Sequence, residues 1–274
     1  MTRLVLAPGL RVLDRGPWDV QIGITPGAAL RVPAGPAVRR ALDLLEAGET
    51  VPGDLAPALA PALVDADALA PEGVDPRDAA AAALHDPAGF AWRLHGRRAA
   101  RVLVLGDLGH PGTDPRPLLT AAGVGLAAAS EPPDAVLLLA TEEPDRALLD
   151  PLVRDEVPHL LVRAVEGTVV VGPLVEPGRT ACLRCLDAHH AVDDPLYPAL
   201  VAVHHRAERQ DGVAEPVDGA LAVLAVAWAV RDLVTHLDGE RAATWSATVH
   251  AGPHLADLAA VQWQRHPDCG CRWT

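Results

Sequence analysis

The chain has 274 residues, half of them apolar, which is enough to bury the cores of two modest domains. Its basic residues are 23 arginines and no lysine, and with 36 acidic residues the net charge is −13. This balance argues against nucleic acid as a partner and excludes any mechanism that needs a catalytic lysine. The sequence shows neither an apolar run of membrane-spanning length nor a signal peptide, so we expect a cytoplasmic protein with no membrane partner.

The first 70 residues are predicted to form a small unit of three strands and three helices. Alternating apolar residues at 10–14 and 18–24 flank a turn and predict a β-hairpin, and a short third strand follows at 28–32. A helix is predicted at 37–48, and residues 54–69 are predicted to form two short helical pieces separated by prolines. This order is the layout of a winged helix-turn-helix.

A DNA-binding role is the first alternative for such a unit. Its recognition segment, residues 54–69, contains three aspartates and no arginine, so contacts to phosphate would be repulsive. Trp18 in the hairpin is predicted to pack against its neighbours rather than to stack on a ligand. Residues 71–98 are predicted to be a linker, because the stretch begins with a run rich in proline, alanine and aspartate.

Residues 99–274 are predicted to form an α/β domain with a Rossmann-like sheet. The apolar strand 101–107 ends in a glycine-rich loop, and strands and helices then alternate along the chain. The long apolar helix 217–237 suits a buried position or the contact of a homodimer. The remaining strands are predicted at 125–129, 135–140, 160–163, 168–175, 244–250 and 258–264, and the other helices at 116–122 and 145–156.

The glycine-rich loop is a poor match to a nucleotide-binding loop. Gly106 and Gly109 do not fit the spacing G-x-G-x-x-G, and Pro111 lacks an N–H group that a phosphate would use. Only four residues separate the second strand from the third, which leaves no room for a crossover helix. Glu131 is the one acidic candidate for ribose hydroxyls. We therefore do not expect ATP to bind.

The four cysteines form two close pairs, Cys182/Cys185 and Cys269/Cys271, and the sequence contains no others. Four thiolates are the ligands of a closed, structural zinc site, which we favour. Two disulfides would require an oxidising compartment, and a redox C-x-x-C would not need the second pair. His266 could compete as a ligand, although a hydrogen bond from it to a thiolate is the better expectation.

Three further features near the cysteines have simple explanations. The histidine pairs 189–190 and 204–205 lie among aspartates, which predicts solvated surface. Arg184 lies inside the first cysteine pair, where it either screens thiolate charge or is solvated. No Ser/His/Asp grouping is recognisable from spacing.

The segment 172–185, GPLVEPGRTACLRC, resembles the G-P-x-x-x-P-G-x-T-x-C-x-x-C stretch of E1-like (ThiF-type) proteins. The resemblance covers about 170 residues from Arg101 to the C-terminus, and it implies an E1-like fold in which both cysteine pairs hold one structural Zn²⁺. Active members adenylate a carboxylate with an Arg, a Lys and an Asp around ATP. Here Glu142 and Glu143 stand where members have Asp, and the chain has no lysine, so the resemblance implies a degenerate domain.

One branch is similar over both halves of the chain. It is the ocin-ThiF-like partner of YcaO cyclodehydratases in azole and azoline peptide biosynthesis, which joins a winged-helix peptide clamp to a degenerate E1-like domain. This resemblance implies that the chain binds a precursor's leader peptide beside strand 28–32, in a groove against the predicted helix, and presents the peptide to a YcaO enzyme. The residues expected to contact the peptide are Ala28, Ala29, Leu30, Arg31, Val32, Leu63 and Leu69.

Two other functions stay open at this point. The first is an active E1-like adenylyltransferase that acts on a protein or peptide C-terminus. The second is a housekeeping adaptor of the same fold. For the leader-binding interpretation, the net charge of −13 predicts a preference for a peptide with some basic residues.

Overall fold

The computed structural model describes residues 3–55, 57–206 and 216–271. The chain consists of two compact units. The first comprises Met1–Arg98 with Ala121–Gly123, and the second comprises Ala99–Thr120 with Val124–Thr274.

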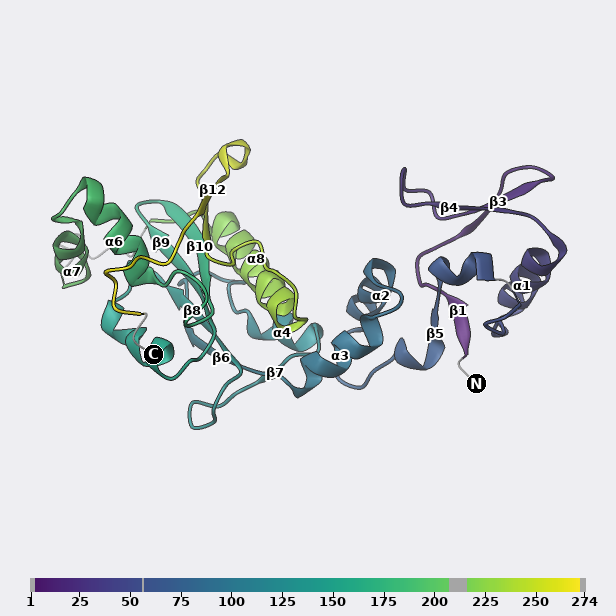
Figure 1. Cartoon of the computed structure of the whole chain (residues 1–274), viewed down its shortest axis with the longest axis horizontal. Helices are drawn as coiled ribbons and strands as arrows, with labels where there is room; N and C mark the ends of the chain where they lie inside the picture. The colour runs from purple at the N-terminus through teal and green to yellow at the C-terminus, as the bar shows by residue number, and fades with distance from the viewer. Residues whose placement is uncertain (1–2, 56, 207–215, 272–274) are drawn as a thin grey trace. The chain divides into compact units, whose positions relative to one another are not determined.

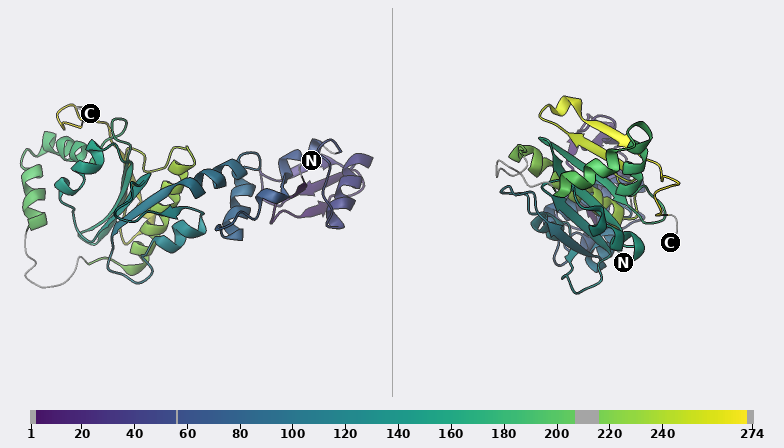
Figure 2. Two further views of the ribbon diagram at one scale, coloured as in Figure 1. Left: turned by 90° about the horizontal axis from the view of Figure 1, so that it is seen from below. Right: turned by 90° about the vertical axis from the view of Figure 1, so that its left-hand side faces the viewer.

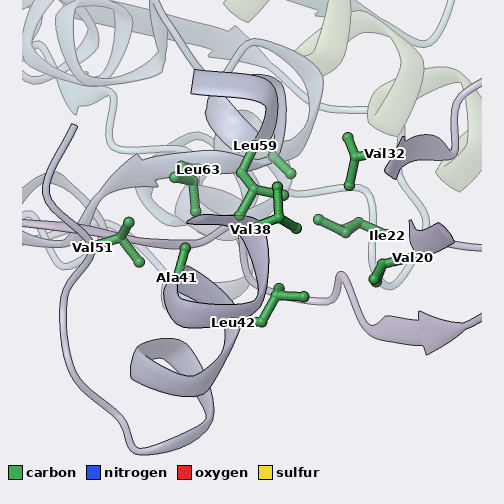
Figure 3. Close-up of a cluster of buried hydrophobic side chains, with 10 residues drawn as sticks. Val20, Ile22, Val32, Val38, Ala41, Leu42, Val51, Leu59 and Leu63 are labelled. Carbon is green, nitrogen blue, oxygen red and sulfur yellow. The ribbon is translucent and has the colours of Figure 1, made fainter. Parts of the chain in front are cut away.

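The N-terminal unit contains a three-stranded antiparallel sheet covered by a helix (Figure 1). In α1 the apolar residues Val38, Ala41 and Leu42 are three and four positions apart, so they share one face and are buried. With Val20, Ile22 and Val32 of the sheet they form the core shown in Figure 3. The elements are β2 (Val12–Asp14), β3 (Asp19–Ile22), β4 (Leu30–Pro33) and α1 (Pro36–Glu46), in the sheet order β2-β3-β4.

The prediction of two short helical pieces at 54–69 is only partly correct. The structure has the 3₁₀-helix η1 (Pro57–Ala62), the strand β5 (Leu63–Asp65) and the 3₁₀-helix η2 (Ala66–Ala68). Prolines disfavour an α-helix here, because proline lacks the N–H group that a helix interior needs. β5 pairs antiparallel with β1 (Leu4–Leu6), which the sequence did not predict because its partner is about 60 residues away.

The stretch expected to be a linker forms two helices, α2 (Pro76–His85) and α3 (Phe90–Ala99). The Asp75 side chain accepts a hydrogen bond from the Arg77 amide and so caps α2, and Pro76 occupies the first turn, where proline is tolerated. The buried apolar residues of both helices belong to a second cluster of this unit, formed by Ala7, Val64, Ala79, Ala83, Phe90 and Leu94. The alanine-rich composition therefore reflects close helix packing.

The second unit is built on a seven-stranded mixed sheet in the order β12-β11-β10-β9-β8-β6-β7. Its parallel part confirms the predicted α/β class, and the three strands that follow β9 along the chain pair antiparallel. The parallel strands are β6 (Arg101–Gly106), β7 (Gly125–Leu126), β8 (Ala135–Ala140) and β9 (His159–Val165). The antiparallel strands are β10 (Thr168–Val175), β11 (Ala247–Ala251) and β12 (Ala259–Gln262).

Helices cover both faces of this sheet (Figures 1 and 2). The long helix α8 packs against β9 and β10. On the opposite face, Val136, Leu161 and Val175 of the strands form a core with the start of α6. The helices are α4 (Arg116–Ala121), α5 (Asp150–Arg154), α6 (Leu183–Asp193), α7 (Tyr197–Arg206) and α8 (Gly219–Leu237), with the 3₁₀-helices η3 (Arg146–Leu148) and η4 (Leu255–Asp257).

Helix α8 is the one helix among the described residues whose length and apolarity would suffice to cross a membrane. Half of its apolar stretch is buried within the fold, and a core helix of a globular protein has the same composition. Asp232 near its C-terminal end is buried and accepts hydrogen bonds of 2.7 and 2.6 Å from the Thr244 amide and hydroxyl. This contact ties α8 to the segment that leads into β11.

Candidate metal centre and peptide-binding edge

The four predicted cysteines come together in the second unit. Their sulfur atoms all lie within 4.8 Å of one another, although 84 residues separate Cys185 from Cys269. Cys182 is the N-cap of α6 and Cys185 lies in its first turn, so the helix presents both sulfurs on one side. Gly270 has a φ of +81°, a conformation that glycine adopts readily, and it lets the chain bend sharply between Cys269 and Cys271.

The distances between the sulfurs fit a metal site better than disulfides. Five of the six lie between 2.8 Å, for Cys269 and Cys271, and 3.9 Å, for Cys182 and Cys269, and all six are within 4.8 Å. A disulfide bond is about 2.05 Å long, and all four cysteines are free. Four thiolates at about 2.3 Å from a tetrahedral zinc lie about 3.8 Å apart. The cluster is therefore compatible with a structural metal held by four thiolates.

The electrostatics of the cluster are also compatible with a bound cation. The hydrogen bond to Cys185 and burial raise the pKa of the Cys182 thiol far above its usual value. The hydrogen bond from Cys182 lowers the pKa of Cys185 to about 4, and burial raises the pKa of Cys269 to about 12. Sulfurs this close cannot all be charged on their own, whereas a metal ion would stabilise four thiolates together.

The surroundings of the cluster differ in part from the expectations. Nδ1 of the His266 ring accepts a hydrogen bond from the Asp268 amide at 3.2 Å. Arg184 forms a bidentate ion pair with Asp150 on the surface, and each of its two hydrogen bonds is 2.7 Å long. A cavity of about 290 Å³ lies beside the cluster and is lined by Cys182, Cys269 and Cys271, so these three cysteines face an open space.

The first histidine pair is not simply solvated surface. His189 is half-buried, its Nε2 lies 2.8 Å from the Gln264 carbonyl, and its ring lies near Trp263 and His266. His190 is exposed but contacts the rings of Tyr197 and Trp263. In the second pair His204 is exposed as predicted, while the side chain of His205 lies outside the described residues.

In the N-terminal unit, β4 is an edge strand, since it pairs only with β3 within the described residues. The Ala34 amide donates to the Trp18 carbonyl at 2.8 Å, which makes these two residues a hydrogen-bonded pair. In an antiparallel ladder such pairs alternate, so Val32 and Leu30 also bond to β3. The main chain of Arg31 therefore points outward at the free edge, as does the nitrogen of Pro33, which has no hydrogen to donate.

The predicted peptide-contacting residues divide into two groups. Ala28 and Ala29 belong to a turn, in which both amides donate to the Thr25 carbonyl. Leu30, Arg31 and Val32 lie on β4, with Val32 buried and the Arg31 side chain exposed beside Asp19. Leu63 lies on β5 and is 7% exposed within the core, and Leu69 is half-buried against the second cluster. The segment that contacts β4 is the 3₁₀-helix η1 and not the stretch that contains Leu63 and Leu69.

Trp18 corrects another expectation. It was predicted to pack in the hairpin, yet 81% of it is exposed. It lies directly before β3 and next to the end of β4, through the hydrogen bond from Ala34. An exposed tryptophan beside a free strand edge is typical of a contact site, because its large ring gains most from burial by a partner.

The glycine-rich loop after β6 forms hydrogen bonds among its own residues. A Cβ on Gly106 would clash with the main-chain oxygen of Leu139, so packing against β8 alone explains this glycine. The Gly109 amide donates to the Asp107 carboxylate at 2.8 Å, and the Thr113 amide donates to the His110 carbonyl. One amide of the loop is thus bonded to a carboxylate and another to a carbonyl, so neither is free to bind a phosphate. Glu131 caps its own turn by accepting from the Ala128 amide.

A buried ion network near the metal centre was not predicted. Arg146 donates to both oxygens of Asp187, at 2.8 and 2.7 Å, and to Glu143 at 2.7 Å. Glu143 also accepts from Arg163 at 2.7 Å. All four side chains are about 90% buried. Burial alone would lower the pKa of Arg146, but its hydrogen bonds and ion pairs with Asp187 and Glu143 raise it, so the acidic partners hold this arginine charged.

No protein-family model matches the sequence, and no curated protein matches it. Solved structures match in fold. The heterocyclase TruD has a TM-score of 0.70 and 17% identity over 99% of this chain. A heterocyclase in complex with substrate and cofactor has a TM-score of 0.70 and 16% identity over 99%. MccB of E. coli has a TM-score of 0.62 and 12% identity over 98%.

These matches support the E1-like fold that the cysteine segment implied, and at such identities they establish the fold alone. The chain spans 43% and 39% of the two heterocyclase chains, less than half of each. It spans 96% of the MccB chain.

Proposed function

We propose that this chain is a non-catalytic, E1-like protein that binds the leader of a ribosomally made precursor peptide. It presents that peptide to a separate cyclodehydratase of the YcaO type. The observation that carries the proposal is the free edge of β4 in a unit separate from the α/β unit. The shared fold supports it, since one matching MccB structure contains MccA and one matching heterocyclase structure contains its substrate.

The peptide would add to the sheet as a fourth strand. A strand edge offers unpaired N–H and C=O groups, and pairing with them gives affinity with modest demands on sequence. At this edge the outward groups belong to Arg31, while Val32 faces the core. Trp18 lies at one end of the edge, where it can cover an apolar side chain of the peptide.

The local charge does not favour a basic peptide. Residues 1–98 contain ten arginines and twelve acidic residues, so most of the net charge of −13 belongs to the second unit. Binding to the β4 edge should therefore depend on strand pairing and apolar contact more than on a basic peptide.

The proposal is tested by fluorescence anisotropy with the leader of a precursor encoded beside the gene. Arg31→Pro removes the outward amide and should weaken binding at least tenfold, because a hydrogen bond is lost and the ring obstructs pairing. Arg31→Ala keeps the amide and is the matched control, with binding expected within about threefold of wild type. Equal binding by the two variants, or binding that survives deletion of residues 1–70, would contradict the proposal.

An adenylyltransferase is the competing function, since structures of MccB with ATP share this fold. The hydrogen-bonded loop around Asp107 and the lack of lysine oppose it. Calorimetry with Mg-ATP should detect no binding, and a pyrophosphate-exchange assay should detect no turnover. Micromolar affinity together with exchange would establish the competing function instead.

A further inference from the structure

The N-terminal unit has an open pocket of about 280 Å³ beside β2, at the edge of the sheet opposite β4. In the order β2-β3-β4, β2 pairs only with β3 within the described residues, so it is a second free edge. We call this space, between β1, β2 and the end of α1, the β2 pocket. It is lined by Val5, Leu6, Val12, Leu45, Glu46, Gly48 and Glu49.

The main chain of β2 directs unpaired groups toward this free edge. The Gly23 amide donates to the Arg11 carbonyl at 2.9 Å, which makes these two residues a hydrogen-bonded pair. Such pairs alternate along an antiparallel ladder, so the next residue, Val12, turns its N–H and C=O groups away from β3. Asp14, two residues later, does the same. An added strand can therefore pair with β2.

The end of β1 leaves a further residue unpaired at the same pocket. On the side away from β5, the Leu4 carbonyl accepts from the Val51 amide at 3.0 Å, and Leu6, two residues later, points to that same side. The pairing does not continue to Leu6, because the Glu49 amide donates to the Leu44 carbonyl at 2.8 Å and the chain turns back toward α1. Within the described residues, no other strand fills the space between β1 and β2.

The rim of the β2 pocket is negative. Glu46 and Glu49 are exposed, and neither forms an ion pair within the described part of the chain. Asp43 and Glu46 both lie in the last turn of α1, which contains no basic residue. A helix carries partial negative charge at its C-terminal end, so carboxylates there are unfavourable and a cation is favourable. The rim therefore attracts a basic side chain.

We propose that the β2 pocket binds an extended segment of a second protein, in which a large apolar residue and an arginine or lysine are two positions apart. The segment adds to β2 as a strand and pairs with its outward main-chain groups. Side chains two positions apart lie on one face of a strand. The apolar side chain thus covers Leu6, Val12 and Leu45, and the basic side chain reaches Glu46 or Glu49.

This site can be occupied together with the edge proposed for the leader peptide. β2 and β4 are the two outer strands of the sheet, and β3 lies between them. A peptide that pairs with β4 therefore leaves the outward groups of β2 free. The two edges also differ in charge, since Arg31 is exposed on β4 whereas Glu46 and Glu49 line the pocket at β2.

The test is fluorescence anisotropy of the full-length, metal-loaded protein with the fluorescein-labelled peptide TVTLTRT, whose valine, leucine and arginine share one face in a strand. TVTLTRT should bind at least tenfold more tightly than TVTTTRT, which lacks the large apolar side chain. It should bind about fivefold more tightly than TVTLTET, which reverses the charge, and a rise in salt from about 0.05 to 0.5 M should remove that preference.

Val12→Pro tests the strand pairing. It removes an outward amide without removing a hydrogen bond to β3, and it should weaken binding of TVTLTRT at least tenfold. Arg31→Pro makes the same change at the opposite edge and is the matched control, with binding expected within about threefold of wild type. Unchanged thermal midpoints of both variants confirm that they fold.

A pair of double variants tests the rim. Glu46→Gln combined with Glu49→Gln should weaken binding of TVTLTRT about fivefold. Asp43→Asn combined with Asp54→Asn removes two charges from exposed positions of the same unit that do not line the pocket, and binding should stay within about twofold of wild type.

The comparison of the three peptides on the wild-type protein decides even if a variant does not fold. Lack of saturable binding by TVTLTRT, or equal binding of TVTLTRT and TVTLTET, would overturn the proposal. Loss of binding in Arg31→Pro but not in Val12→Pro would show that the peptide binds at β4 instead. A concentration-dependent dimer that Val12→Pro dissociates would show that a second copy of the chain occupies the pocket, and it would also overturn the proposal.

Discussion

The buried ion network makes a quantitative prediction about stability. Glu143 accepts one hydrogen bond of 2.7 Å from Arg146 and another of 2.7 Å from Arg163, and it is about 90% buried. Glu143→Gln keeps the shape but removes the charge, and its NH₂ group then faces a guanidinium N–H. Arg146 retains Asp187, whereas Arg163 loses its carboxylate partner. Breaking a buried pair in this way costs about 3–5 kcal/mol.

Asp150→Asn is the matched control for this prediction. Asp150 also forms two 2.7 Å bonds to one arginine, but about half of each side chain of this pair is exposed. Exposed pairs contribute at most about 1 kcal/mol. The assay is native-state hydrogen exchange, in which the slowest amides of β8 and β9 report the free energy of opening the second unit. A loss in Glu143→Gln no larger than in Asp150→Asn would refute the reasoning.

Three further predictions concern the metal, the pH dependence and the peptide edge. Elemental analysis should find one zinc per chain, and Cys271→Ser should speed hydrogen exchange in residues 262–271 and in α6, because metal ligation is coupled to folding; normal exchange in metal-free protein would contradict this. Burial lowers the pKa of His159, so on acidification the unfolded chain takes up a proton that the folded chain does not. The free energy of unfolding should therefore decrease as the pH falls below about 6.5. The midpoint of urea unfolding, measured against pH, should show this decrease, and His159→Asn should make it smaller. Trp18→Ala should change stability by less than about 0.5 kcal/mol and still weaken leader binding measured by anisotropy, whereas a large loss of stability would show that the ring is packed.

The sequence predicted the grouping of the four cysteines and most strands of the second unit, for local reasons. Each cysteine pair is short, so its spacing alone indicates that two sulfurs can meet at one point. The strands β6, β8, β9 and β10 are long apolar runs, and the length of such runs separates them from loops. Helix α8 is recognisable from its composition and from Asp218, which caps it.

The features that sequence reasoning missed depend on partners far along the chain. β1 and β5 have three residues each and exist because they pair with each other. Arg146 and Asp187 are 41 residues apart, and nothing in either local sequence distinguishes a buried ion pair from two solvated side chains. The direction of the main-chain amides in β4 also depends on a distant partner. Only the pairing of β4 with β3 shows that Arg31, rather than Val32, has its amide at the free edge.

Helix α6 connects the four-cysteine cluster to a cavity of about 340 Å³ that lies where β8 and β9 end. Cys182 caps the helix and Cys185 lies in its first turn, while farther along Asp187 joins the ion network and His190 lines the cavity. The cavity's opposite wall includes Trp263, which belongs to the segment that the second cysteine pair holds in place. A metal ion on the four cysteines would thus fix two walls of the cavity at once. Loss of the metal should therefore loosen both walls, although no cysteine lines the cavity.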